Sequence, residues 1–196
     1  MIKYGLFLKP GIQTIEFLNR QKENYKKINK KQNFIDDQPH LTLFHGKFKN
    51  KEEALSKFNQ VLVDDLPILS FRFVGPHIFF NDHSPGFNTL VYTINPDKNL
   101  LTLQKELLDI FNPFKPSNFF NLDKKYLLNI KKYNYPFLGL DFIPHFTITN
   151  IEIKKDSSLI KEFLNQNVQL NDYFESIFLA EISDGLEIIS EKKYAL

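Results

Sequence analysis

Two short stretches, PHLTL at residues 39–43 and PHFTI at residues 144–148, carry most of the information about the fold of this sequence. In each, a proline precedes a run of apolar and hydroxyl residues that is typical of a β-strand. Successive side chains of a strand point to opposite faces, so the histidine and the threonine two positions later share a face, roughly 7 Å apart. Leu41 and Phe146 then point to the other face, into a core. Each stretch predicts a strand with an apolar side and a polar His/Thr side.

Both stretches belong to a longer internal repeat. His145 follows His40 by 145 − 40 = 105 positions, and Phe163 follows Phe58 at the same offset. Upstream, each half has an expected strand that ends in a proline, at residues 10 and 96, which gives an offset of 96 − 10 = 86. The difference, 105 − 86 = 19 residues, fits an insertion around residues 112–132. The repeat predicts one domain over residues 1–196, made of two pseudo-symmetric lobes with interleaved strands, each lobe strand-helix-strand-helix-strand.

The pattern between these landmarks alternates strands with helices, which indicates an α+β or α/β class. Strands are expected at 2–9, 40–44, 66–80, 89–94, 144–148, 173–182 and 186–194, the third broken by Gly75-Pro76. Helices are expected at about 12–31, 51–63, 97–111, 121–132 and 156–166.

Composition excludes several classes of protein. The chain has 196 residues and no cysteine, so disulfide frameworks, thiolate metal sites and cysteine nucleophiles are ruled out. With 25 basic and 23 acidic residues the net charge is +2, which argues against binding nucleic acid by bulk charge. There is no apolar run of membrane-spanning length and no signal-peptide pattern at the N-terminus. We therefore expect a soluble, cytoplasmic protein that does not bind membranes.

The paired motifs suit chemistry on a phosphate. A neutral imidazole accepts a proton near pH 7 and an imidazolium donates one, while a threonine hydroxyl donates to a phosphoryl oxygen. Two such pairs would flank one phosphorus, one histidine activating the attacking oxygen and the other protonating the leaving oxygen. One His-x-Thr alone is more simply explained as a strand histidine beside a hydroxyl. Two of them, each after a proline and in register within a repeat, favour a catalytic site at His40, Thr42, His145 and Thr147.

At these residues the sequence resembles the two-histidine (2H) phosphoesterase superfamily, which includes cyclic phosphodiesterases and RNA 2′-5′ ligase-like enzymes. The resemblance implies an α+β fold of two lobes, in which two antiparallel sheets form a V-shaped groove with helices outside. It also implies cleavage of RNA or nucleotide phosphodiesters, 2′,3′-cyclic or 2′-5′-linked, without metal or cofactor and in RNA processing. His40 and His145 would be the acid/base pair, and Thr42 and Thr147 would bind the phosphate. The expected partners are RNA ends or a small nucleotide, with no obligate protein partner.

Other residues have weaker claims on the substrate. Arg72 faces away from the core if Phe71 and Phe73 face it, and could reach a phosphate. Tyr135 and Phe137 precede the second motif and could stack on a base, or could simply fold onto the core. Lysine clusters precede both motifs, at residues 22–31 and 124–132, either as solvated helix faces or as guides for a polyanion.

The remaining histidines have no predicted role. His45 lies on the apolar register of its strand unless a bulge intervenes, and we interpret it as structural or as part of the rim. His77 and His83 lie near a Pro/Gly loop and carry no motif. The alternative to a phosphodiesterase is an RNA- or nucleotide-binding module of the same fold with little turnover. A third possibility is an interaction domain in which the motifs are incidental.

Overall fold

The computed structural model describes residues 2–61, 66, 68–82, 86–111, 127–133, 137, 141–182 and 186–193. The predicted alternation of strands and helices is confirmed along these residues. The first helix ends at Lys26 rather than near residue 31, the two-residue strand β2 follows it, and part of the fourth expected helix lies outside the described residues. The elements are β1 (Ile2–Pro10), α1 (Ile12–Lys26), β2 (Gln32–Asn33), β3 (Leu41–Phe48), α2 (Lys51–Asn59), β4 (Ser70–Phe79), β5 (Asn88–Pro96), α3 (Lys98–Phe111), α4 (Leu127–Tyr133), β6 (His145–Ile151), α5 (Ser158–Leu164), β7 (Asn171–Glu181) and β8 (Glu187–Lys193).

The strands form one closed sheet, which corrects the expectation of two separate sheets. Six of them are hydrogen-bonded in the order β1-β3-β6-β5-β4-β7, and β7 pairs again with β1. All pairings are antiparallel. The two junctions are narrow: β3 and β6 share the pair Leu41–Phe146, and β4 and β7 pair over Ser70–Arg72. Sequence periodicity identifies strands but not these few hydrogen bonds between distant segments, so the closure was missed.

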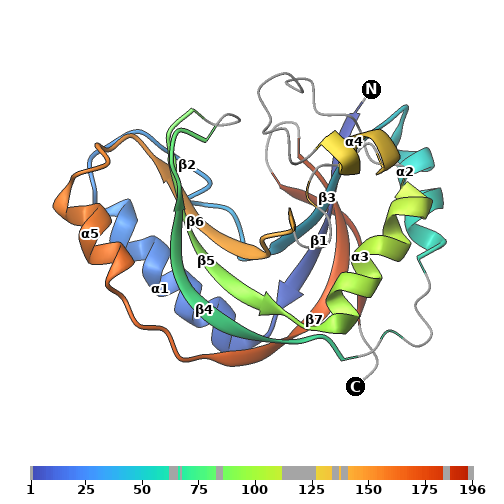
Figure 1. The fold of residues 1–196 in the computed structure, drawn as a ribbon. Helices are drawn as coiled ribbons and strands as arrows, with labels where there is room; N and C mark the ends of the chain where they lie inside the picture. Colours follow the sequence, from blue (N-terminus) through green and yellow to red (C-terminus); the bar gives the residue numbers. More distant parts are fainter. Residues whose placement is uncertain are drawn as a thin grey trace.

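The two sequence repeats exchange strands and helices in space. The repeats are β1-α1-β3-α2-β4 and β5-α3-β6-α5-β7, yet β4 pairs with β5 and β7 pairs with β1. Figure 1 shows α1 and α5 beside β4, β5 and β6, with α2, α3 and α4 beside β1, β3 and β7. The helices therefore cover the outside of both halves of the sheet. Among the described residues, no helix is long and apolar enough to cross a membrane.

The core lies between the helices and the sheet, and leucine and phenylalanine supply most of its buried side chains. Phe71, Phe146 and Phe174, from β4, β6 and β7, have ring centroids 4.6–6.2 Å apart at the narrow junctions. Such rings bury large apolar areas and gain further from edge-to-face contacts. We call the sheet face that packs on the helices the outer face, and the opposite one the inner face.

Both motif strands carry a β-bulge at the same place. The ladder between β1 and β3 skips Leu43, and the ladder between β5 and β6 skips Ile148. These residues are 148 − 43 = 105 positions apart, which is the offset of the two motifs. The first strands of the two repeats, β1 and β5, pair with the bulges at Leu6 and Leu90, which are 90 − 6 = 84 positions apart. The offset of 86 suggested by the prolines is therefore two residues too long. Bulges re-aim the side chains that follow them.

Candidate active site

The structure brings the four motif residues together at the junction of β3 and β6. Leu41 and Phe146 form the connecting pair, and both are fully buried on the outer face. Extending the antiparallel register of this pair by one residue on each side places His40 beside Thr147 and Thr42 beside His145. Neighbouring side chains in such a pair are about 5 Å apart, and the diagonal imidazoles about 7–8 Å. All four side chains therefore share the inner face at the junction of β3 and β6.

Each imidazole is oriented by the same backbone contact. The Nδ1 atom of His40 lies 2.7 Å from the carbonyl oxygen of Gln38, and that of His145 lies 2.7 Å from the carbonyl oxygen of Ile143. A carbonyl oxygen only accepts, so each Nδ1 carries the hydrogen, and in the neutral ring Nε2 keeps its lone pair. The prolines at 39 and 144 fix the backbone between donor and acceptor. Both rings therefore present Nε2 as the group that takes or gives a proton.

Aromatic rings pack against the two imidazoles, although both keep an edge in solvent. Phe7 and Phe178 lie 4.6 and 6.4 Å from the His40 ring, centroid to centroid, and Phe79 lies 5.1 Å from the His145 ring. Desolvation lowers the pKa of His40 to about 4 and lowers the pKa of His145 below its usual value, because the charged ring loses water. Both histidines are neutral at pH 7 in the free protein.

Charged groups nearby distinguish the two histidines. The ammonium of Lys22 and the charge on His145 both lower the pKa of His40, after desolvation and against the hydrogen bond to Gln38. For His145, burial lowers the pKa most; the hydrogen bond to Ile143 and the carboxylate of Asp82 raise it, and His77 lowers it.

Asp82 is held by a chain of hydrogen bonds that crosses the inner face of β6 and β5. Asn33 donates to Asn150 (3.1 Å), Asn150 donates to the hydroxyl of Thr89 (2.9 Å), and Thr89 donates to the carboxylate of Asp82 (2.8 Å). Asn150 and Thr89 are buried, so the chain lies in a poorly hydrated place where such bonds reinforce one another. Every donor points toward the carboxylate, which stabilises its charge near His145.

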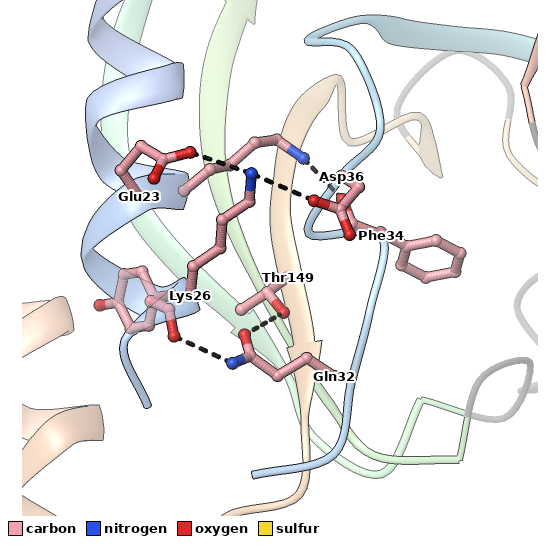
Figure 2. Close-up of polar contacts among 8 residues, drawn as sticks. Glu23, Lys26, Gln32, Phe34, Asp36 and Thr149 are labelled. Carbon is pink, nitrogen blue, oxygen red and sulfur yellow. Dashed lines mark hydrogen bonds and ion pairs between the residues drawn. The ribbon is translucent and has the colours of Figure 1, made fainter. Parts of the chain in front are cut away.

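The segment before His40 is fixed to α1 and β6. Figure 2 shows the contacts around Lys26, Gln32 and Phe34. Lys22 is 4% exposed and donates to the Phe34 carbonyl, and Lys26 is in ion pairs with Glu23 and Asp36, so both lysines of the first cluster make contacts within the protein. The contacts are Lys22 Nζ to the Phe34 carbonyl (2.6 Å), Lys26 Nζ to Glu23 (2.9 Å) and Asp36 (3.1 Å), Gln32 Nε2 to the Tyr25 carbonyl (2.9 Å), and Thr149 Oγ1 to Gln32 (3.0 Å).

The three weaker sequence candidates have different outcomes. Phe71 and Phe73 are buried in the core, and Arg72 is exposed on the opposite side, as expected. On β5, Asn95 pairs with Arg72 of β4, and Thr93 pairs with His145 of β6. Because Thr93 and Asn95 share a face of β5, Arg72 lies on the inner face, two strands from His145 and about 7 Å further along the strand direction. Phe137 is 40% exposed, and its carbonyl accepts from Gln104 of α3. Tyr135 lies outside the described residues.

The face of His45 depends on a bulge that the sequence left open. The bulge at Leu43 puts Leu43 and Phe44 both on the outer face, so His45 returns to the inner face with Thr42. Its ring lies 5.9 Å from that of Phe7, whose other neighbour is His40. Two consecutive buried apolar residues after the motif are the sequence signal of this bulge, and it was not used. Within the part of the chain that the structure describes, no three histidine or carboxylate side chains are grouped as metal ligands.

Comparison with solved structures gives full-length matches at low sequence identity. A Thermus thermophilus protein, TT0787, is 15% identical with a TM-score of 0.65, covering 98% of this chain and 97% of its own. A phosphoesterase is 10% identical with a TM-score of 0.55, covering both chains completely. Escherichia coli LigT, complexed with NADP⁺, is 9% identical with a TM-score of 0.57, covering 100% of this chain and 98% of its own.

This chain has the fold of LigT and of a solved phosphoesterase. Other structures of LigT hold phosphate, ATP or 3′-AMP. Comparisons with protein-family models and with the sequences of curated proteins find no match. The expected resemblance is therefore confirmed for the fold over the whole length, while the chemistry rests on the site itself.

Proposed function

We propose that this protein is a metal-independent phosphodiesterase that opens 2′,3′-cyclic phosphates, or cleaves 2′-5′ linkages, at RNA or nucleotide ends. One observation carries the proposal: two imidazoles, each held through Nδ1 by the carbonyl two residues earlier, stand on one face beside the threonine of the opposite motif. The binding of phosphate and of 3′-AMP by LigT, which shares the fold, supports a nucleotide phosphate as the ligand.

The reaction follows from the geometry. One Nε2 atom takes a proton from water as the water oxygen bonds to phosphorus. The bond from phosphorus to one ribose oxygen breaks, and the other histidine gives its Nε2 proton to that oxygen. The hydroxyls of Thr42 and Thr147 donate to the non-bridging oxygens, where negative charge increases. The products are a phosphomonoester and a free hydroxyl, on one ribose for a cyclic phosphate and on separate nucleosides for a 2′-5′ linkage. Proton exchange with solvent then restores both imidazoles.

The charges around the site support one assignment of the two roles. A general base must be neutral, and Lys22 favours the neutral form of His40. A general acid must be protonated, and Asp82 favours the protonated form of His145. The bound phosphodiester adds a negative charge beside both rings, which raises their pKa values in the complex. We therefore assign His40 as the base and His145 as the acid.

The test is turnover of adenosine 2′,3′-cyclic phosphate in the presence of a chelator. We expect His40→Ala and His145→Ala each to lower kcat by about 10²–10⁴-fold, the usual contribution of a general acid or base, with the fold checked by circular dichroism. Loss of turnover on adding the chelator would refute the metal-free proposal. Tight nucleotide binding without turnover by the unmodified protein would favour the binding module.

A second substrate separates the two roles. A nitrophenolate leaving group needs no protonation, so a 4-nitrophenyl phosphodiester depends on the base alone. We expect His145→Ala to keep most of its activity on this substrate and His40→Ala to lose it. The reverse pattern would exchange the two assignments and leave the proposed reaction class intact.

A further inference from the structure

A polar cavity of about 310 Å³ lies between α1, the end of β1 and the segment that leads to His40. We call it the α1 cavity. None of the four motif residues lines it, and its volume is in the range of sites for small molecules. Three ammonium groups and three carboxylates line its walls, from Lys9, Lys22, Lys26, Glu23, Asp36 and Asp37. The cavity is therefore a second place in the molecule where charged side chains gather around a space.

Most of these charges are already paired. Lys26 lies 2.9 Å from Glu23 and 3.1 Å from Asp36, and Figure 2 shows its ammonium between the two carboxylates. Lys9 lies 3.4 Å from Glu175 of β7. Within the part of the chain that the structure describes, Lys22 and Asp37 are the lining charges without an ion pair inside 4 Å. The pairing thus leaves one positive and one negative group facing the cavity.

These two groups come from different walls, Lys22 from α1 and Asp37 from the segment before His40. Burial is the largest influence on both: it lowers the pKa of Lys22 to about 8 and raises the pKa of Asp37, while each charge favours the charged form of the other. Lys22 is 4% exposed, and one of its three N–H donors goes to the Phe34 carbonyl (2.6 Å). Buried charges are normally paired, so an occupant that pairs both groups would be stabilised here.

A small zwitterion meets both charges at once. Its carboxylate would accept from the Lys22 ammonium, and its own ammonium would donate to the Asp37 carboxylate. A simple anion or a simple cation would pair with one of the two groups and be repelled by the other. Ile15 and Ile35 also line the cavity and offer apolar contact to a side chain. Together these groups match a free α-amino acid with an apolar side chain.

The wall of the cavity is continuous with the backbone that orients His40. Gln38 and Pro39 line the cavity, and the Gln38 carbonyl oxygen lies 2.7 Å from Nδ1 of His40. The same segment begins at Phe34, which has a φ of 65°, a left-handed conformation that bulky residues rarely adopt, and whose carbonyl Lys22 holds. A group that binds Lys22 and fills the space beside Gln38 therefore acts on both ends of this segment.

We propose that the α1 cavity binds a free α-amino acid with an apolar side chain, and that its occupation is transmitted to His40 through Gln38. This site is separate from the phosphate site, and its test does not depend on phosphodiesterase activity.

The binding experiment is calorimetric titration with three matched probes: L-leucine, L-leucinamide, which lacks the carboxylate, and 4-methylpentanoate, which lacks the ammonium. We expect L-leucine to bind with a Kd of about 1 mM or lower, and each analogue at least tenfold more weakly, because each loses one charge-assisted hydrogen bond. Lys22→Met and Asp37→Asn should each weaken L-leucine at least tenfold. Asp37→Asn decides the question if Lys22→Met does not fold.

The control is Lys27→Met, which removes an exposed ammonium just after α1 and should leave the affinity for L-leucine unchanged. Absence of L-leucine binding, or binding that survives both cavity variants, would overturn the site. Equal affinity for 4-methylpentanoate would overturn the zwitterion and indicate a plain anion site.

The transmission is read from the imidazole NMR signals of the two histidines during the same titration. The signals of His40 should move as L-leucine saturates the protein. Those of His145 should stay in place, because its ring is held by the carbonyl of Ile143, which does not line the cavity. Binding of L-leucine with unmoved His40 signals would refute the transmission.

Discussion

A single methyl group added at Gly5 should disturb both the stability and the activity of this protein. Gly5 lies on the inner face of β1, opposite His45, and the ring of Phe7 folds back over it. A Cβ atom at Gly5 would stand 2.9 Å from Cε1 of Phe7, with Cζ and Cε2 nearer still. The ring cannot simply swing into solvent, because it is 1% exposed and packs between His40 and Phe178.

The expected cost of Gly5→Ala follows from this overlap. Overpacking of a closed site typically costs about 1–3 kcal/mol, and the lower chain entropy of alanine in the unfolded state returns about 0.4–1 kcal/mol. The net loss of unfolding free energy should be about 1–2 kcal/mol, measured by urea denaturation. Gly46→Ala is the matched control on the neighbouring strand, where the added Cβ would meet Phe48 at 3.0–3.2 Å, and it should cost clearly less.

The activity should fall as well, because the displaced Phe7 ring pushes against the His40 ring, 4.6 Å away. A shift of about 1 Å in a catalytic group can cost about 10²-fold, so we expect kcat/KM on adenosine 2′,3′-cyclic phosphate to drop at least tenfold. Shortening the ring in Gly5→Ala/Phe7→Leu should relieve part of the stability loss, giving a coupling of at least 0.5 kcal/mol. Equal effects of Gly5→Ala and Gly46→Ala, with no coupling to Phe7, would refute this reasoning.

Three further predictions follow from the charges and caps. The profile of kcat/KM against pH should rise as His40 loses its proton around pH 4, and it should fall as His145 loses its proton below pH 6.5. An optimum above pH 7 in a pH–rate series would contradict the assignment of the two roles. Asp82→Asn removes the charge that raises the pKa of His145, so only the alkaline limb of the pH–rate profile should move, to lower pH. We expect kcat/KM at pH 7 to fall by up to about tenfold. Movement of the acid limb would mean that Asp82 acts on His40. Asp172→Ala should lower the unfolding free energy by about 1–2 kcal/mol in urea titrations. Asp172 accepts from the backbone N–H (3.1 Å) and the hydroxyl (2.7 Å) of Thr14, at the start of a helix whose own N-cap residue is a glycine. An unchanged urea midpoint would show that this cap is dispensable.

Much of the site was readable from sequence because its geometry is local. The Nδ1 contacts of His40 and His145 reach only two residues back, and each His/Thr pair needs only the period of a strand. The two motifs also lie at one constant offset, so the relation between the halves was visible without coordinates. The proposed acid/base pair therefore rests on features that a short peptide segment already contains.

The residues around the pair depended on contacts that periodicity does not encode. The face of His45 could not be decided from sequence, because one extra residue in β3 reverses the alternation after Leu43. Asp82 follows β4 and approaches His145 only through the pairing of β5 with β6 and the buried bond from Thr89. Lys22, from a cluster that suggested a guide for a polyanion, is buried against the carbonyl of Phe34.

The sequence by itself determined the strand and helix order, the two His/Thr pairs and the absence of thiol chemistry, since each depends on residue type and short-range spacing. Only the tertiary structure decided that the strands close into one sheet and that the two pairs meet on one face. It also placed Lys22 near His40 and Asp82 near His145, and the proposed assignment of His145 as the proton donor rests on this arrangement. These properties arise from hydrogen bonds between segments about 100 residues apart, such as Leu41 with Phe146, and no local pattern specifies such a pairing.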